Sequence, residues 1–212
     1  GLLSTIAYRH QGKITYALEG ASFIAGAGVQ WFRDQLKAIT NASQIEDEAK
    51  NVKDLSKVQH LFFYPFFSGL GSPHWRSDAL ASIYGMSRDT GLPEISYALL
   101  DGLAQSITDL KEAAEKDLQN LLTSFHVDGG ACKNNLLMQM QANYIGIDVK
   151  RPKQVETTFS GAAIGVKLFI EKTPPSALAS KQSFEKCFMP IKDSFFMDRR
   201  NRWVEMLRKI YL

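Results

Sequence analysis

The stretch Val127-Asp128-Gly129-Gly130-Ala131-Cys132-Lys133-Asn134-Asn135 decides the fold, because it joins a predicted strand to a predicted helix through two adjacent glycines. Residues 125–128 indicate a short buried strand, and the apolar spacing of residues 134–145 indicates a helix. Glycines at such a junction let a ligand approach the backbone, and a helix N-terminus offers unpaired N–H groups and partial positive charge to a phosphate. A tight strand-to-helix connection explains the same glycines without a ligand. Asp128 is either a cap for the following helix or a catalytic acid.

The segments on either side of this stretch repeat the alternation of strands and helices. Apolar residues at steps of three or four predict a long helix over residues 94–122. Beyond the stretch, residues 147–150 predict a strand that Pro152 stops. Two further helices are predicted at 160–170, ended by Thr173-Pro174-Pro175, and at 199–211, with Trp203, Leu207 and Ile210 on one face. This order of elements predicts an α/β fold.

The first part of the chain contains shorter elements. Two strands joined at Gln11-Gly12-Lys13 predict a hairpin, because glycine between alternating apolar residues marks a turn. Residues 21–39 predict an amphipathic helix that contains Gly26 and Gly28. Glycine costs about 1 kcal/mol in a helix interior, so this pair indicates that something packs very close to the backbone. A short helix at 45–55, a strand at 61–65 and a loop at 68–73 complete this part.

The composition is that of an ordinary globular protein and argues against several classes of function. Among 212 residues, 45% are hydrophobic and 22% are charged, and the net charge of +3 is too balanced to indicate nucleic-acid or membrane binding. No apolar stretch reaches the roughly 20 residues of a membrane-spanning helix. The 2 cysteines suit a reducing cytoplasm, and the 4 histidines lack the spacing of a zinc site. We therefore expect a cytoplasmic protein without a metal site of its own.

Several motifs occur in a fixed order along the chain: Tyr16-Ala17-Leu18-Glu19-Gly20, Phe23-Ile24-Ala25-Gly26-Ala27-Gly28-Val29-Gln30-Trp31, Phe67-Ser68-Gly69-Leu70-Gly71-Ser72-Pro73-His74-Trp75, Asp128-Gly129-Gly130 with Asn134-Asn135, and Glu156-Thr157-Thr158 with Gly161-Ala162-Ala163. They resemble the successive motifs of the carbohydrate kinases of the glycerol-kinase type. The resemblance extends over essentially the whole chain, which looks like only the C-terminal half of such an enzyme. The start at Gly1, with no initiator methionine, also reads as a piece of something longer.

The resemblance implies an actin-like, ribonuclease-H-like ATPase fold, with a mixed sheet flanked by helices. Residues 1–212 are then a single C-terminal nucleotide-binding domain, and the N-terminal domain, with the glycerol pocket and the aspartate that acts as general base, is absent. The implied reaction is ATP-dependent phosphorylation of glycerol, with Mg²⁺ in the intact enzyme and ATP or ADP held by this half. No catalytic residue is expected in this chain, which alone should be inactive. A kinase of another small sugar or polyol, and a noncatalytic nucleotide- or protein-binding module, remain alternatives.

Four residues match family positions that contact the adenine nucleotide: Gly26, Gln30, Gly130 and Asn134. Gly26 and Gly130 also sit where the sequence itself requires a close backbone approach. Gln30 has an alternative reading as an exposed polar residue on a helix. Asn134 has an alternative reading as a helix N-cap. The run from Gly161 to Ala163 is interpreted as a site of close helix packing and not as a binding site.

The chain also departs from the family pattern. Arg76-Ser77 and Ala79-Leu80-Ala81 stand where the family usually has Asp-Pro and Ala-Arg-Gly, and Tyr97 and Asp101 stand where it often has arginine and glutamate. These changes leave the nucleotide motifs intact. Without a partner domain, we expect an exposed aromatic patch around Phe66, Phe67 and Trp75, which would favour self-association into a homo-oligomer.

Overall fold

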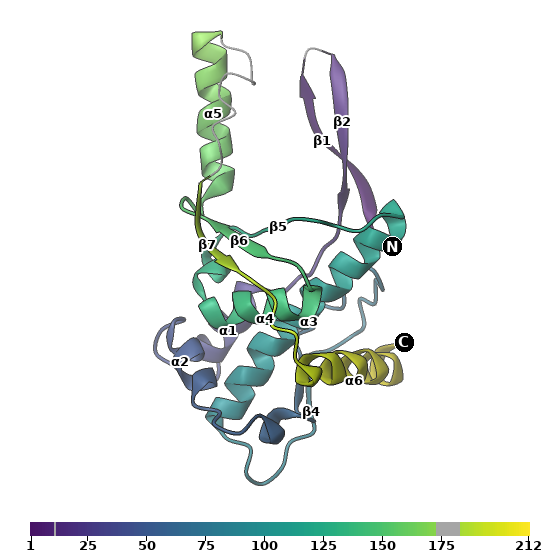
Figure 1. Cartoon of the computed structure of the whole chain (residues 1–212), viewed down its shortest axis with the longest axis vertical. Coiled ribbons are helices and arrows are strands. Elements are labelled where there is room, and N and C mark those ends of the chain that lie inside the picture. Colours follow the sequence, from purple (N-terminus) through teal and green to yellow (C-terminus); the bar gives the residue numbers. More distant parts are fainter. Residues whose placement is uncertain (11, 173–182) are drawn as a thin grey trace.

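A computed structural model describes residues 1–10, 12–172 and 183–212 of the chain. Figure 1 shows a helical body from which a two-stranded hairpin and one helix project at the same end. The elements in chain order are β1 Leu3–His10, β2 Lys13–Glu19, α1 Gly26–Asp34, α2 Gln44–Lys50, the 3-10 helix η1 Leu55–Val58, β3 Phe62–Tyr64, β4 Ser82–Tyr84, α3 Leu92–Leu118, β5 Phe125–His126, the 3-10 helix η2 Gly130–Lys133, α4 Asn135–Ile145, β6 Val149–Pro152, α5 Thr157–Glu171, β7 Phe184–Phe188 and α6 Ser194–Tyr211.

The long helix α3 is the centre of the molecule, and its prediction is confirmed. It begins two residues earlier than expected because the Glu94 side chain turns back and accepts a hydrogen bond of 2.9 Å from the Gly91 N–H. It ends at Leu118 because Gln119 takes a left-handed conformation with φ of 52°. The core gathers around α3 from α1, α2, α4 and the strand β3.

The predicted α/β arrangement is confirmed in the second half of the chain. Strand β6 lies between β5, which runs parallel to it, and β7, which runs antiparallel to it. The strand predicted at 147–150 lies two residues later, and it ends at Pro152, which is its last residue. The sequence analysis missed β4 and β7. The predicted hairpin forms as β1 and β2, although Gln11 of its turn lies outside the described residues, as do Thr173-Pro174-Pro175.

Several predicted boundaries are too wide in the first part of the chain. The helix expected over residues 21–39 is the nine-residue α1, so Gly26 is its first residue and not an interior one. Close packing holds only for Gly28, where an added Cβ would lie 3.2 Å from Ile24 Cγ2 and 3.4 Å from Leu99 Cδ1. At Gly26 an added Cβ would meet nothing within 4 Å.

Helix α6 closes the molecule against a second, aromatic core. Trp203 and Leu207 are buried there as predicted, but Ile210 is 41% exposed, because Tyr211 takes the inward position. Arg199 lies on the buried face of α6, and its guanidinium donates to the Asp101 carboxylate at 2.6 Å. It also donates to the carbonyl oxygens of Val58 and Leu61. The ion pair between Arg199 and Asp101 thus attaches α6 to α3.

The predicted aromatic patch is wrong. Phe66 is only 4% exposed because it packs against Tyr211, and Phe67 stacks on Trp31 with ring centroids 4.7 Å apart. Trp75 alone is exposed, and its indole N–H donates to the Gly1 carbonyl. Exposed large apolar side chains occur on the hairpin and on α5, and also at scattered positions elsewhere, such as Leu80, Leu121 and Met189.

The expectation of close packing at Gly161 is also wrong, since α5 has no buried residue and an added Cβ at Gly161 would meet nothing within 4 Å. In the part of the chain that the structure describes, no helix combines the length and apolarity needed to cross a membrane.

Candidate nucleotide site

A pocket of about 670 Å³ opens between α1, α2 and the turn that leads from β5 into α4. All four residues nominated from the sequence line it: Gly26, Gln30, Gly130 and Asn134. The floor is apolar and is formed by side chains of three helices: Ile45 of α2, Leu100 and Leu103 of α3, and Leu137 of α4. The structure therefore brings together two motifs that are widely separated along the chain.

One wall of the pocket is a single face of α1. Gly26, Gln30 and Arg33 follow one another at steps of four and three, which places them on the same side of a helix. The open space at the Gly26 Cβ position is therefore space of the pocket. Arg33 also donates to Asp34 at 2.6 and 2.9 Å, and this hydrogen bond lowers the pKa of the Asp34 carboxyl.

The opposite wall is the double-glycine turn, in which the two glycines have different roles. Gly129 has a φ of 76°, a positive value that residues with a side chain rarely adopt. Its N–H donates to the Val155 carbonyl at 2.8 Å. Gly130 has no positive φ, and an added Cβ there would meet nothing within 4 Å. The conformation of the turn thus requires Gly129, whereas Gly130 keeps the pocket open.

Arg151 of β6 holds this turn from behind. Its guanidinium donates to the Cys132 carbonyl at 2.8 Å and to the Lys133 carbonyl at 3.3 Å. Arg151 is 6% exposed and forms an ion pair with Glu185 of β7 at 3.2 Å. Burial raises the pKa of the Cys132 thiol, which suits a structural residue and not a nucleophile. The neighbouring sheet therefore fixes the backbone that faces the pocket.

The start of α4 differs from the sequence-based expectation of unpaired N–H groups. The Asn134 side-chain oxygen accepts from the Leu137 N–H at 2.8 Å, so the N-cap reading of Asn134 is confirmed. Glu46 of α2 accepts from the Asn135 N–H at 3.0 Å, and the Asn134 carbonyl accepts from the Met138 N–H. The protein itself thus satisfies much of this helix end. The Asn134 side-chain oxygen is thus engaged as a cap, and its NH₂ group keeps two hydrogen-bond donors.

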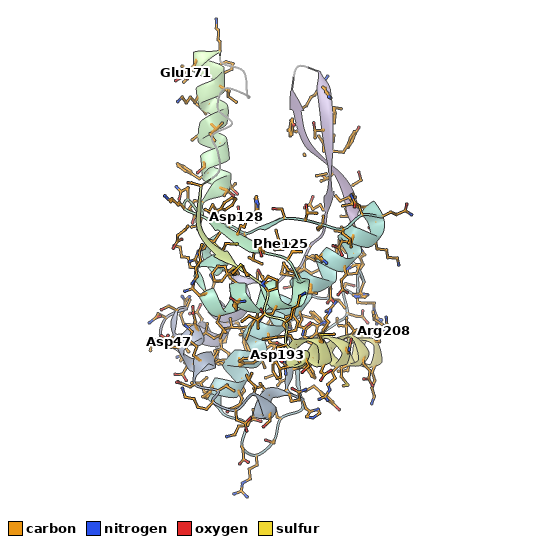
Figure 2. The ribbon with its side chains drawn as sticks, in the orientation of Figure 1. Asp47, Phe125, Asp128, Glu171, Asp193 and Arg208 are labelled. Carbon is orange, nitrogen blue, oxygen red and sulfur yellow. The ribbon has the colours of Figure 1, made fainter. Side chains whose placement is uncertain are left out.

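Asp128 lies at the foot of α5 (Figure 2), where its carboxylate accepts a hydrogen bond from the Thr157 hydroxyl. The expectation that it caps the following helix is wrong, because Asn134 caps α4 and Asp128 contacts α5. The charges at the pocket are mixed: Arg33 and Lys133 are basic, and Glu46 and Asp128 are acidic. Among the described residues, no group of three or more His, Cys, Asp and Glu side chains is placed to hold a metal ion.

The sequence analysis missed three charged residues of the pocket. Two of them could have been predicted from the sequence. Arg33 continues the helical spacing of Gly26 and Gln30, and Lys133 directly precedes Asn134. Glu46 could not have been predicted, because its contact is with Asn135, which lies 89 positions away in the sequence.

Comparisons with solved structures show that this fold is shared with sugar kinases. Glycerol kinase from Plasmodium falciparum, solved with ADP, superposes with a TM-score of 0.84 at 31% identity, covering 100% of this chain and 42% of that one. Xylulose kinase from Lactobacillus acidophilus superposes with a TM-score of 0.77 at 20% identity, covering 95% of this chain and 41% of that one. The expected actin-like α/β fold is thereby confirmed.

Sequence comparison places the chain within a family. Residues 3–165 match the C-terminal domain of the FGGY family of carbohydrate kinases. The chain belongs to that family. Among curated relatives, glycerol kinase from Myxococcus xanthus is 44% identical over 196 residues, which are 90% of this chain and 38% of the relative. Glycerol kinase from Natranaerobius thermophilus is 43% identical over 203 residues, which are 96% of this chain and 40% of the relative. The chain thus spans about two fifths of the length of the curated relatives it matches.

Proposed function

We propose that this chain is the nucleotide-binding half of an ATP-dependent glycerol kinase, which converts glycerol and ATP into glycerol 3-phosphate and ADP. The observation that carries the proposal is the pocket itself, because two distant motifs supply its opposite walls. The glycerol kinases among the relatives favour glycerol over another polyol as the acceptor. The likeness to xylulose kinase concerns the fold alone.

In this proposal each wall of the pocket has a distinct role toward the nucleotide. The apolar floor of Leu100, Leu103 and Leu137 receives the planar base. Gln30 and the NH₂ group of Asn134 supply polar contacts that orient it. Gly130 allows the nucleotide to lie against the backbone of the turn, which Arg151 holds in place. Holding the nucleotide in one position is the larger part of catalysis in phosphoryl transfer, since the protein performs little covalent chemistry there.

The complete reaction needs groups that we assign to the region preceding this one in the relatives. These are the glycerol pocket and the carboxylate that accepts the hydroxyl proton. Mg²⁺ would reach the site with the phosphates of the nucleotide, which are its usual partners in kinases. We place the enzyme in the cytoplasm, where two free cysteines stay reduced.

The isolated chain should accordingly show no phosphorylation of glycerol above background. Loss of a positioned general base costs roughly 10²- to 10⁴-fold, and loss of half the cleft removes orientation as well. A coupled assay of ADP release with glycerol measures this. Turnover near 1 s⁻¹, about the low end for enzymes, would contradict it.

Binding of ADP to the isolated chain tests the proposal directly, by competition with a fluorescent ADP analogue. Because half of the contacts are missing, we expect a Kd near 1 mM, about 4 kcal/mol of binding free energy. Gly130→Val should abolish binding, because its side chain enters the pocket. Gln30→Ala should raise the Kd about fivefold, the value of one hydrogen bond of about 1 kcal/mol.

Two matched variants are the controls for this experiment. Gly161 also has open space at its Cβ position but lies on α5, so Gly161→Val should bind ADP like the parent chain. Gln35 follows α1 outside the pocket, so Gln35→Ala should also be neutral. Equal binding by Gly130→Val and Gly161→Val would show that the double glycine is only a turn.

A further inference from the structure

Glu46 is an acidic residue in the wall of the nucleotide pocket, and its contacts use only part of its carboxylate. It lies on α2 and lines the pocket, and its side chain is 13% exposed. One carboxylate oxygen, Oε2, accepts from the Asn135 N–H at 3.0 Å, and the other, Oε1, pairs with Lys50 Nζ at 2.5 Å. A carboxylate offers about four acceptor positions. Glu46 can therefore accept a further hydrogen bond from a ligand in the pocket.

The packing of α2 holds Glu46 in this position. Its neighbours Ile45 and Ala49 are 0% and 1% exposed and belong to the main core. The contact with Asn135 fixes the carboxylate to the start of α4, where Asn134 also lines the pocket. A group that is fixed in advance loses little freedom when a ligand binds, so its hydrogen bond contributes more fully to binding.

The chemistry of a carboxylate restricts which part of a nucleotide can lie beside Glu46. A carboxylate only accepts hydrogen bonds, so its partner must carry an O–H or N–H group. The ionised phosphates of ADP carry neither, and two negative charges at contact distance repel each other. On the nucleoside, the two ribose hydroxyls and the 6-amino group of adenine are donors. Glu46 therefore suits the nucleoside and excludes the phosphates.

The phosphates have suitable partners elsewhere in the pocket. Helix α1 begins at Gly26, its N-cap residue Ala25 has no side chain able to cap it, and its first turn contains no acidic residue. The N–H groups and partial positive charge of such a helix start favour an anion. Lys133 adds a positive charge to the lining of the pocket. The phosphates thus have partners that leave Glu46 to the nucleoside.

We propose that Glu46 is a specificity-determining residue of this site, which accepts a hydrogen bond from a donor group of the nucleoside and so fixes the orientation of the nucleotide in the pocket. The inference rests on the proposed function and deepens it, because it adds a residue that the sequence motifs do not mark. This role differs from the support that Glu46 gives to the start of α4, since that support is the same for every ligand.

Binding of ADP and three analogues to the 212-residue chain tests this role. The analogues are 2′-deoxy-ADP, 3′-deoxy-ADP and the diphosphate of purine riboside, each of which lacks one donor group of ADP. The analogue without the donor that contacts Glu46 should bind roughly fivefold more weakly than ADP, which is the effect of one hydrogen bond. A chemical-shift titration measures each Kd. The analogue that shows the loss distinguishes the ribose from the base as the source of the donor.

Variants of Glu46 separate contact with the ligand from support of the fold. The measured quantity is the ratio of the Kd of that analogue to the Kd of ADP, in which a general weakening of the site cancels. In Glu46→Ala this ratio should fall from about five to about one, because neither ligand finds an acceptor there. Glu46→Gln keeps an acceptor oxygen without the charge, so its ratio should lie between the two values.

Asp47 provides the matched control. It is the next residue on α2 and is labelled in Figure 2, but it is exposed and does not line the pocket. Asp47→Asn removes one negative charge from the same helix and should keep the ratio of the parent chain.

Two results would overturn the proposal. One is equal binding of ADP and all three analogues by the parent chain. The other is a ratio that both Glu46 variants leave unchanged, even if all ligands bind more weakly, because this would reduce Glu46 to support of α4. Should Glu46→Ala not fold, the ratio in Glu46→Gln decides. A parent chain that binds no ADP at all would instead contradict the proposed function, and this inference with it.

Discussion

At the scale of single residues, we expect Gly129 to matter for folding and Gly130 for ligand binding. Gly129 occupies a backbone region that only glycine visits readily, and holding another residue there costs of order 1–3 kcal/mol. We therefore expect Gly129→Ala to lower the free energy of unfolding by about this amount. Gly130→Ala should leave stability within about 0.5 kcal/mol, because its Cβ enters open space. Urea denaturation of both variants measures the difference, and equal losses would contradict the assignment.

Glu46 is expected to stabilise the start of α4 through a hydrogen bond to the backbone. Its carboxylate accepts from the Asn135 N–H and pairs with Lys50 at 2.5 Å, joining α2 to the start of α4. A hydrogen bond to a charged group contributes about 1.5–3 kcal/mol, so Glu46→Ala should lower the free energy of unfolding by roughly that amount. Glu46→Gln keeps an acceptor oxygen and should lose less. If both variants unfold like the parent, the contact is not a structural one.

These residues also show how far the sequence leads toward the site. Local patterns and family motifs were enough to predict four residues of the pocket: Gly26, Gln30, Gly130 and Asn134. Glu46 could not be predicted in this way, since a charged residue in a polar helix carries no sign of a partner in another element. The capping role of Asn134 also required coordinates, because the sequence left helix capping and nucleotide contact as alternatives.

At the scale of elements, the attachment of α6 depends on a buried ion pair. Arg199 and Asp101 are both fully buried, and the Tyr144 hydroxyl also donates to Asp101. Removal of one partner from a buried pair typically costs about 3–5 kcal/mol, because the other charge stays unpaired. We expect this loss for Arg199→Met in chemical denaturation. Arg208→Met, on the exposed side of the same helix, should change stability by less than about 0.5 kcal/mol.

A double variant checks the physical reason. When Asp101→Leu is combined with Arg199→Met, no charge stays buried alone, so part of the stability should return. A double variant that loses the sum of both single losses would contradict the role of the ion pair.

The loop after β3 gives a pH-dependent prediction. Partial burial of His74 lowers its pKa below the ordinary value of 6.5. The Asp109 carboxylate opposes this shift, whereas the N-terminal ammonium group and Arg208 add to it. The unfolded chain therefore takes up a proton first as the pH falls. His74 contributes stability above pH 6.5 and loses that contribution below it. The free energy of unfolding, measured between about pH 7 and 5, should fall less steeply in His74→Gln than in the parent chain. An unchanged slope would contradict this.

Elements differed in how well the sequence predicted them, and burial explains the difference. Helix α3 was predictable because its apolar period runs through 27 residues and the core surrounds it. The strands β4 and β7 were missed, because three to five residues of mixed character hold no clear period. Helix α5 was predicted from its composition, but the close packing expected at Gly161 was wrong, because none of the residues of α5 is buried.

At the scale of the whole molecule, the helical body is well packed, whereas the projecting helix α5 is not covered by any buried contact. The body in Figure 1 contains two packed cores and the helix α6, whereas none of the residues of α5 is buried. Two residues that depart from the family pattern, Arg76 and Asp101, lie in the packed body. Arg76 donates to the Tyr211 carbonyl at 2.6 Å, and Asp101 holds Arg199. Both residues thus contact α6.

A chemical-shift titration of ADP against the isolated chain tests most directly whether this domain is a nucleotide-binding half. We expect weak, saturable binding, with a Kd of about 1 mM and with the largest shifts at Gly26, Gln30, Gly130 and Asn134 and their neighbours on the two walls of the pocket. Shifts that cluster elsewhere on the molecule, or no saturable shift at several times that concentration, would contradict it.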